Sequence, residues 1–289
     1  VDVSSERQRP ALVSVVWSML TVGIVAGAIL ASRFLGTACA STDLNLVIAG
    51  VERLIVVAPL VIFGLILLAV LGVERPISQP AEQAQSAADR PAELSFAQAW
   101  TVLRASPQVA YFFGVLSLFT FSLFLQEAVL EPYGGAIFGM DVCATTRLNA
   151  IWGVGTLVGI ATTGFLLVPR LGPQRTALLG GVLAGVFVLL MVVAGAVVSE
   201  PLFRLALLLF GYAAGVSTNA SLTLMLGLTS PALAGTFIGV WGLAQAYARG
   251  VATVTGGGLL SLFGGVFGGQ ETYGAYASVF VIQAVGLLL

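Results

Sequence analysis

Eight long apolar segments, separated by short polar stretches, constrain this chain more than any other feature of its sequence. A helix needs about 20 apolar residues to cross the hydrocarbon core of a bilayer, and each segment has or approaches this length. Since 58% of the 289 residues are hydrophobic and 9% are charged, a soluble fold could not bury so much apolar surface. The sequence therefore predicts an all-α polytopic membrane protein, with spans at about 11–35, 46–72, 107–131, 148–168, 176–198, 202–227, 235–263 and 273–289.

The segments are arranged as two spans, one long polar interval and six further spans. Residues 73–106 are rich in Pro, Ala, Gln and Glu and predict a cytoplasmic linker, with a short amphipathic helix over Ser95–Arg104 at the membrane surface. With a cytoplasmic N-terminus, seven arginines lie on the inner side and three on the outer side, as the positive-inside rule favours. We expect residues 1–72 to be the last two helices of an N-terminal bundle and residues 107–289 to form a C-terminal six-helix bundle. Because the chain opens on Val1 and stops inside an apolar run, we expect it to be part of a longer protein.

Two carboxylates stand at the end of the third predicted span, which is otherwise nearly pure hydrocarbon. Ionised carboxylates are costly at membrane depth, so Glu127 and Glu131 are candidates for a gate, a proton-coupling group or a pigment contact. Their spacing of four residues predicts one shared helix face, on a helix that Pro132 and the following glycine pair would end. The structural alternative is that both are interfacial, cap a turn and pair with Arg147.

Arg249 lies near the middle of the seventh predicted span, four residues after Gln245. An isolated guanidinium there costs between about 3 and 15 kcal/mol, so we expect Arg249 to face the protein interior and to find a partner. Arg249 and Gln245 could contact a polar or anionic ligand, or Arg249 could belong to a structural ion pair. The sequence leaves both possibilities open.

Composition argues against several other classes of protein. The chain has no histidine, so the commonest proton relay and the usual ligand of a haem or chlorin are missing. Its two cysteines, Cys39 and Cys143, are too few for a thiolate metal site and predict buried or interfacial thiols, with a disulfide as the alternative. A net charge of −1 suggests no nucleic-acid partner. No nucleophile–base pair or metal-ligand cluster is recognisable, so we assign no catalytic residue and no metal ligand, and expect no enzyme.

Glycines predict where helices approach one another closely. Pairs four residues apart, such as Gly155 with Gly159 and Gly211 with Gly215, suit close packing of membrane helices. Three consecutive glycines, 256–258, predict a bend or hinge in the seventh span.

The turn between the fourth and fifth spans contains Gly164 followed by Arg170-x-Gly172-x-x-Arg175. This pattern resembles the cytoplasmic loop motif of the major facilitator superfamily, in which glycines allow a tight turn and arginines engage helix C-termini and neighbouring acids. The resemblance implies a helix bundle of that type, with the spans of this chain equivalent to spans 5–12.

The block from Gln126 to Gly135, with Leu130-Glu131-Pro132-Tyr133-Gly134-Gly135 as its most specific part, closely resembles the PucC/LhaA family, also called the Bch2/PucC group. These are major-facilitator-like membrane proteins of phototrophic bacteria, and the resemblance covers essentially the whole chain. It implies a non-enzymatic chaperone in the bacterial inner (cytoplasmic or intracytoplasmic photosynthetic) membrane that supports assembly of the light-harvesting antenna complexes LH1 or LH2. The implied partners are the lipid bilayer, antenna polypeptides and, as further candidates, the reaction centre and bacteriochlorophyll. The motif positions that the resemblance offers as binding candidates are Gln126, Glu127, Glu131, Tyr133 and Gly134.

Two points from the residues themselves qualify this expectation. Without histidine, the magnesium of a bound bacteriochlorophyll would need an oxygen ligand from a carboxylate, an amide, a backbone carbonyl or water. The alternative function is a secondary transporter that moves a small solute by alternating access, with Arg249, Glu127 and Glu131 in its pathway.

Overall fold

The computed structural model describes residues 44–71, 107–227 and 234–289, together with residues 15, 18–19, 21–27, 29–30 and 33. The predicted linker over 73–106, with its amphipathic helix at Ser95–Arg104, lies outside the described residues, as does much of the first predicted span. The described helices are α2 (Leu44–Val70), α5 (Pro107–Phe124), α6 (Leu130–Phe138), α7 (Val142–Thr162), the π-helix η2 (Thr163–Leu167), α8 (Val168–Leu171), α9 (Pro173–Ala196), α10 (Glu200–Gly227), α11 (Ala234–Phe267) and α12 (Tyr273–Leu288).

The helices confirm a multi-pass helical membrane protein. Among the described residues, five helical stretches are long and apolar enough to cross a bilayer: α2, the continuous run of α7 through α8, α9, α10 and α11. The helices α5 and α12 are apolar but shorter. The count of eight spans and the major-facilitator fold stay predictions.

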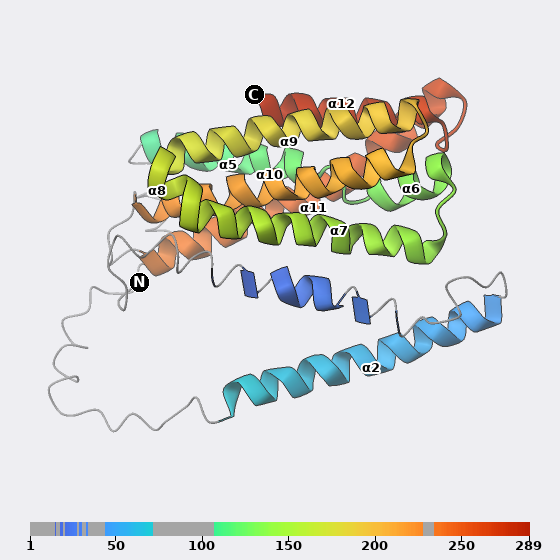
Figure 1. Ribbon diagram of the computed structural model, residues 1–289, viewed down its shortest axis with the longest axis horizontal. Helices are drawn as coiled ribbons and strands as arrows, with labels where there is room; N and C mark the ends of the chain where they lie inside the picture. Colours follow the sequence, from blue (N-terminus) through green and yellow to red (C-terminus); the bar gives the residue numbers. More distant parts are fainter. Residues whose placement is uncertain are drawn as a thin grey trace, which may run out of the picture.

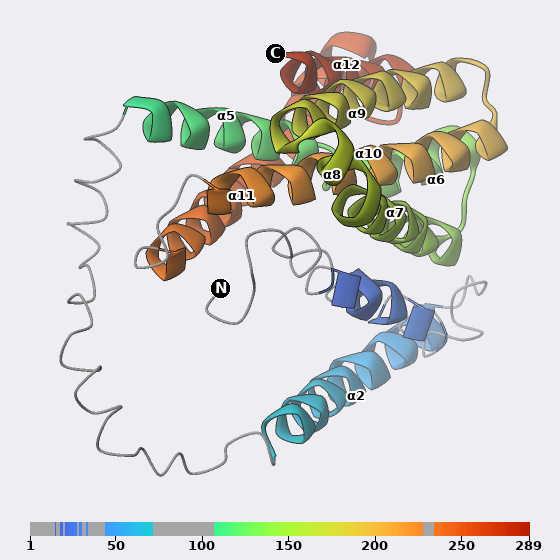
Figure 2. The ribbon, with the colours of Figure 1, turned by 60° about the vertical axis from the view of Figure 1, so that its left-hand side comes forward.

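The helices from α5 onward form one bundle (Figure 1). In it, α10 packs against α7 and α9, α12 packs against α9 and α5, and α11 packs against α5 and α12. The turn at α8 lies at one end of the bundle, and α6 lies at the other end. Helix α2 lies apart from the bundle in both views (Figure 2), and none of its most apolar stretch is buried. Its surface therefore requires lipid or other helices around it.

Close contact between α7 and α10 depends on glycine, as the four-residue spacing predicts. At Gly159 an added Cβ would fall on the backbone carbonyl oxygen of Tyr212. The hydroxyl of Thr156 donates to the carbonyl oxygen of Gly211 at 3.2 Å, which is possible only because the two backbones lie so close. Where lipid gives no hydrophobic drive between helices, such contact stabilises by packing and hydrogen bonding. The same backbone overlap would arise at the other three glycines of this contact: Gly155, Gly211 and Gly215.

An aromatic cluster around Tyr133 joins α6 to the rest of the core. Tyr133 is fully buried, and its hydroxyl donates to the carbonyl oxygen of Met191 in α9 at 3.0 Å. Its ring meets those of Phe203 and Phe280 nearly edge-on, with centroid distances of 5.3 and 4.9 Å. An added Cβ at Gly195 would overlap the Tyr133 hydroxyl, so this glycine makes room for the hydrogen bond. The short helix α6 is therefore fixed by α9, α10 and α12 together.

The prediction that the third span runs on to Glu131 and ends at the proline and glycines is wrong. Helix α5 ends at Phe124, turns follow, and the motif itself forms α6. Pro132 has no N–H to donate to the carbonyl of Ala128, so a helix continued from α5 would lack this hydrogen bond. The turns begin earlier, at Leu125. As the third residue of α6, the same proline needs no intrahelical acceptor.

The prediction of a hinge at the three consecutive glycines is also wrong. Helix α11 continues without a break from Ala234 to Phe267. Gly256 instead faces the turn after α5, where an added Cβ would fall on the carbonyl oxygen of Leu125. The glycine therefore allows close approach between a turn and a helix, which keeps the turn in place.

Cys143, in the first turn of α7, is disulfide-bonded. The only other cysteine in the sequence, Cys39, lies outside the described residues. The expectation of a thiol at Cys143 is therefore corrected to the disulfide alternative.

Candidate functional site

The candidate site is centred on an ion pair between Glu127 and Arg249. Glu127 lies in the turn between α5 and α6, and Arg249 lies near the middle of α11. The guanidinium Nε donates to both carboxylate oxygens of Glu127, at 2.9 Å to Oε2 and 3.1 Å to Oε1, and Nη2 also donates to Oε1. A planar guanidinium that meets a carboxylate through two nitrogens is the geometry that makes such pairs strong and directional.

Two further side chains complete what we term the Glu127–Arg249 cluster. The hydroxyl of Thr253, one helical turn after Arg249, lies 3.1 Å from Oε2 of Glu127. The ring of Phe124 lies beneath the guanidinium, with 4.6 Å between Arg249 Cζ and the ring centroid. A cation over an aromatic face gains attraction from the ring quadrupole, and this gain rises when water is excluded. The cluster therefore holds Arg249 by a carboxylate at its edge and an aromatic ring at its face.

The cluster is partly open at the surface of the bundle. The side chains of Glu127 and Arg249 are 35% and 54% exposed. Within the described part of the chain, the other ion pair joins Glu200 and Arg204, which are four residues apart on α10. The Glu127–Arg249 pair instead connects segments 122 residues apart in the sequence, the turn after α5 and the middle of α11. It presents charged hydrogen-bonding groups beside α11, a helix apolar enough to cross a bilayer.

The other predicted acidic residue lies elsewhere. Glu131 is in the first turn of α6 and accepts a hydrogen bond from the amide of Asn149 in α7 at 2.6 Å. Because the helix breaks between them, Glu127 and Glu131 do not share the helix face that their spacing predicts. The alternative pairing of Glu131 with Arg147 is not formed among the described residues, and Arg147 is exposed on α7.

Three motif positions serve packing rather than the open cluster. Tyr133 is the centre of the aromatic core. Gly134 is buried against α7, where an added Cβ would come within 3.1 Å of the Leu148 side chain. Gln126 is 6% exposed, and no described residue donates a hydrogen bond to its Oε1. Glu127 is therefore the one motif residue that contacts Arg249 in the described structure.

Gln245 lies one helical turn before Arg249 on α11 and is half-buried. Residues four apart share a helix face, so Gln245 and Arg249 can act on the same neighbour. Their shared face agrees with treating the two as candidates of one site.

The predicted loop motif is split between two kinds of structure. Gly164 is buried inside the π-helix η2 and not in a turn, whereas Gly172 connects α8 to α9 with φ of 80°, which favours glycine. The side chains of Arg170 and Arg175 are exposed on either side of Gly172. Only Gly172 therefore has the turn-forming role that the resemblance gives to the glycines.

Sequence reasoning missed Phe124 and Thr253 as members of the cluster. Thr253 could have been found, because it lies four residues after Arg249 on the same predicted helix. Phe124 precedes Glu127 by three residues, but its ring contacts a residue on another helix, for which a local pattern gives no signal.

The fold and the site define a polytopic helical membrane protein with a charged cluster inside its apolar bundle. A family model described as PUCC protein matches residues 1–289, so the chain belongs to the PucC family. A protein named Protein PucC from Rhodovulum sulfidophilum is 28% identical over 256 residues, which cover 89% of this chain and 54% of that protein. Protein PucC from Rhodobacter capsulatus is 27% identical over 308 residues, which cover 100% of this chain and 60% of that protein.

A third relative carries a different kind of name. The Bacteriochlorophyll synthase 44.5 kDa chain of Rhodobacter capsulatus is 28% identical over 303 residues, which cover 98% of this chain and 65% of that protein. The chain thus spans about half to two thirds of the length of these relatives. No solved structure matches it.

Proposed function

We propose that this protein is a non-enzymatic assembly factor for the light-harvesting antenna complexes of phototrophic bacteria. Membership of the PucC family supports a role in photosynthetic complex assembly. The observation that carries the proposal is the Glu127–Arg249 cluster, a half-open polar site on an otherwise apolar bundle. In this proposal, newly inserted antenna polypeptides have polar groups that have not yet met their final partners. The cluster binds these groups transiently until assembly is complete.

The energetics suit such temporary contact. Hydrogen bonds between membrane helices contribute about 0.6 kcal/mol on average, and up to about 1.7 kcal/mol. A few bonds to Glu127, Arg249 and Gln245 would hold a helix long enough for assembly and still release it. Because Glu127 and Arg249 already satisfy each other, the cluster is stable when no partner is bound.

Direct ligation of a bacteriochlorophyll magnesium is not favoured by these residues. Both oxygens of Glu127 accept hydrogen bonds from Arg249, so neither is free for a metal ion. The amide oxygen of Gln126 has no hydrogen-bond partner within the described part of the chain and suits magnesium chemically. Gln126 is buried, however, so a macrocycle could not reach it without a rearrangement. We therefore propose polypeptide handling as the main task and derive no step through the pigment.

The arrangement of the bundle supports a major-facilitator-like organisation as a further part of the proposal. Helices α5 and α11 pack together, α7 packs against α10, and α9 packs against α12, so each early helix of the bundle meets a late one. We propose that residues 107–289 are one six-helix half of such a protein and that residues 1–72 belong to the other half. The chain's share of its relatives' length leaves room for the additional helices of that half.

The proposal is tested by purifying the intact protein from its native photosynthetic membrane in a mild detergent. We expect antenna polypeptides to co-purify, and their identity follows from mass spectrometry of the eluate. Absorption spectra of the same eluate show whether pigment accompanies them. Recovery of the protein without any antenna or reaction-centre polypeptide, combined with solute uptake by proteoliposomes, would contradict the proposal and favour the transporter alternative.

A further inference from the structure

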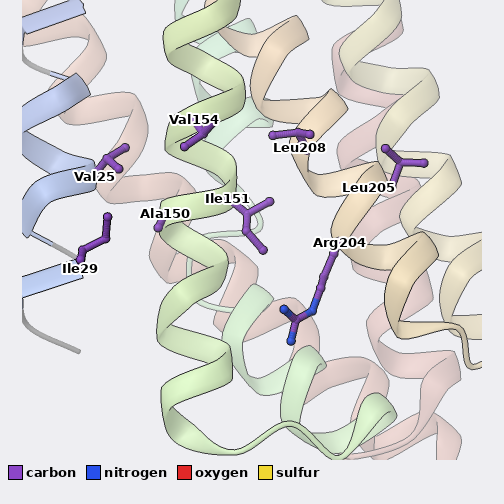
Figure 3. Close-up of a pocket in the computed structure, with 8 residues that line it drawn as sticks. All are labelled: Val25, Ile29, Ala150, Ile151, Val154, Arg204, Leu205 and Leu208. Carbon is purple, nitrogen blue, oxygen red and sulfur yellow. The ribbon is translucent and has the colours of Figure 1, made fainter. Parts of the chain in front are cut away.

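A second site lies between α7, α10 and the described turns of the N-terminal segment (Figure 3). The pocket has a volume of about 400 Å³, which is within the range of about 300–1,000 Å³ common for small-ligand sites. Its walls are aliphatic, and Arg204 is the one charged residue among those that line it. The helices that carry the Glu127–Arg249 cluster do not contribute to it. Its aliphatic lining includes Val25, Ile151, Val154 and Leu208.

The pocket is polar at one end and apolar at the other. Arg204 belongs to the second turn of α10, close to the end of the bundle, whereas Leu208 lies one turn deeper. On α7, Val154 is likewise one turn deeper than Ala150. Figure 3 shows the nitrogen atoms of Arg204 pointing away from Leu208 and Val154. This polarity matches a membrane amphiphile, whose charged head lies at the interface and whose chain lies in the hydrocarbon core.

Arg204 has hydrogen-bonding capacity that the described residues do not use. Its Nη2 pairs with Glu200 Oε1 at 2.5 Å, but its Nε is buried and finds no hydrogen-bond partner among the residues that the structure describes. A buried donor of a charged group left without an acceptor is unfavourable, so an acceptor oxygen supplied by a ligand would stabilise it. Guanidinium groups recognise phosphate through two parallel hydrogen bonds, and Nε is one of the donors that such a contact employs.

We propose that this pocket binds an anionic phospholipid, with an acyl chain along Ile151, Val154 and Leu208 and the phosphate on Arg204. A neutral isoprenoid or acyl chain alone would fill the apolar end but would leave the Arg204 donor unsatisfied. Val25 closes the pocket from the N-terminal segment, so a bound lipid would also contact both parts of the chain. The inference rests on this pocket alone and is independent of the proposed function.

Lipid titration of the purified full chain, followed by native mass spectrometry, tests the proposal. The probes are phosphatidylglycerol and diacylglycerol with identical acyl chains, so that the two lipids differ by the headgroup that carries the phosphate. We expect about tenfold tighter binding of phosphatidylglycerol, since hydrogen bonds to charged groups contribute about 1.5–3 kcal/mol and about 1.4 kcal/mol is a factor of ten. Arg204→Gln should remove this preference, and Glu200→Gln should increase it because the competing carboxylate is gone. Ala150→Leu should weaken binding of both lipids by filling the pocket.

Arg147→Gln is the matched control, because Arg147 is exposed near the same end of the bundle but does not line the pocket. Equal affinity of the wild-type protein for the two lipids would overturn the proposal. So would an unchanged preference in Arg204→Gln, or an equal loss in Arg147→Gln, which would indicate general attraction to basic surface. The increased preference for phosphatidylglycerol that we expect for Glu200→Gln cannot result from misfolding. This variant therefore still tests the proposal if Arg204→Gln proves unstable.

Discussion

Replacing Arg249 by leucine is expected to destabilise the protein by about 3 kcal/mol. The substitution leaves the carboxylate of Glu127 without its guanidinium partner, in a turn that lies beside the middle of α11. A lone charge at membrane depth costs about 2.5–3.5 kcal/mol on insertion scales. Thr253 can satisfy one oxygen of Glu127 but carries no charge. The loss is therefore expected to be far larger than the 0–1 kcal/mol typical of an ion pair at an exposed surface.

Thermal denaturation in detergent, followed by the fraction of protein that stays monodisperse, measures this effect. Arg204→Leu is the matched control, because it also breaks an ion pair, but one between neighbours on a single helix turn near the membrane edge. We expect little change in stability for the control. Equal losses in the two variants would contradict a special role for the pair inside the bundle.

Gly159→Val is expected to prevent stable packing of α7 against α10, at a cost of about 3 kcal/mol or more. The added Cβ would overlap the carbonyl oxygen of Tyr212, and a backbone atom within a helix cannot move aside as a flexible side chain can. The two helices would have to separate along the whole glycine contact, which would also lose the hydrogen bond from Thr156 to Gly211.

The yield of monodisperse protein in size-exclusion chromatography is the measurement for this substitution. Gly242→Val in α11 serves as the control, because an added Cβ there meets nothing within 4 Å while the change in helix propensity is the same. A Gly159→Val protein that elutes and melts like Gly242→Val would show that the close helix contact is not needed.

The membrane character of the chain and its close helix contacts could be predicted because they depend on local patterns. Hydropathy over about 20 residues decides whether a helix can span the bilayer, and glycine spacing decides which helix face can approach another. Glycine spacing did not predict which helix packs against that face. Gly159 contacts the backbone of Tyr212 in α10, and this contact is set by the tertiary fold.

The site was less predictable, because its central contact joins residues 122 positions apart. The cost of a lone guanidinium predicted a partner for Arg249, but its identity required the path of the chain between α5 and α6. That path was mispredicted, since the shared face of Glu127 and Glu131 assumed a continuous helix, whereas turns separate α5 from α6. The disulfide of Cys143 likewise depends on distant chain segments, for which a count of two cysteines gave only an alternative.

In the proposed function, the Glu127–Arg249 cluster acts on antenna polypeptides and does not merely hold α11 to the turn after α5. The double variant Glu127→Gln/Arg249→Gln removes both charges together, so neither charge is left without its partner. The direct measurement is the amount of assembled antenna, from absorption spectra of membranes in which wild-type and double-variant proteins are present at equal levels. We predict a severe loss of antenna with the double variant, whereas antenna at the wild-type level would reduce the pair to a structural contact and contradict the claim.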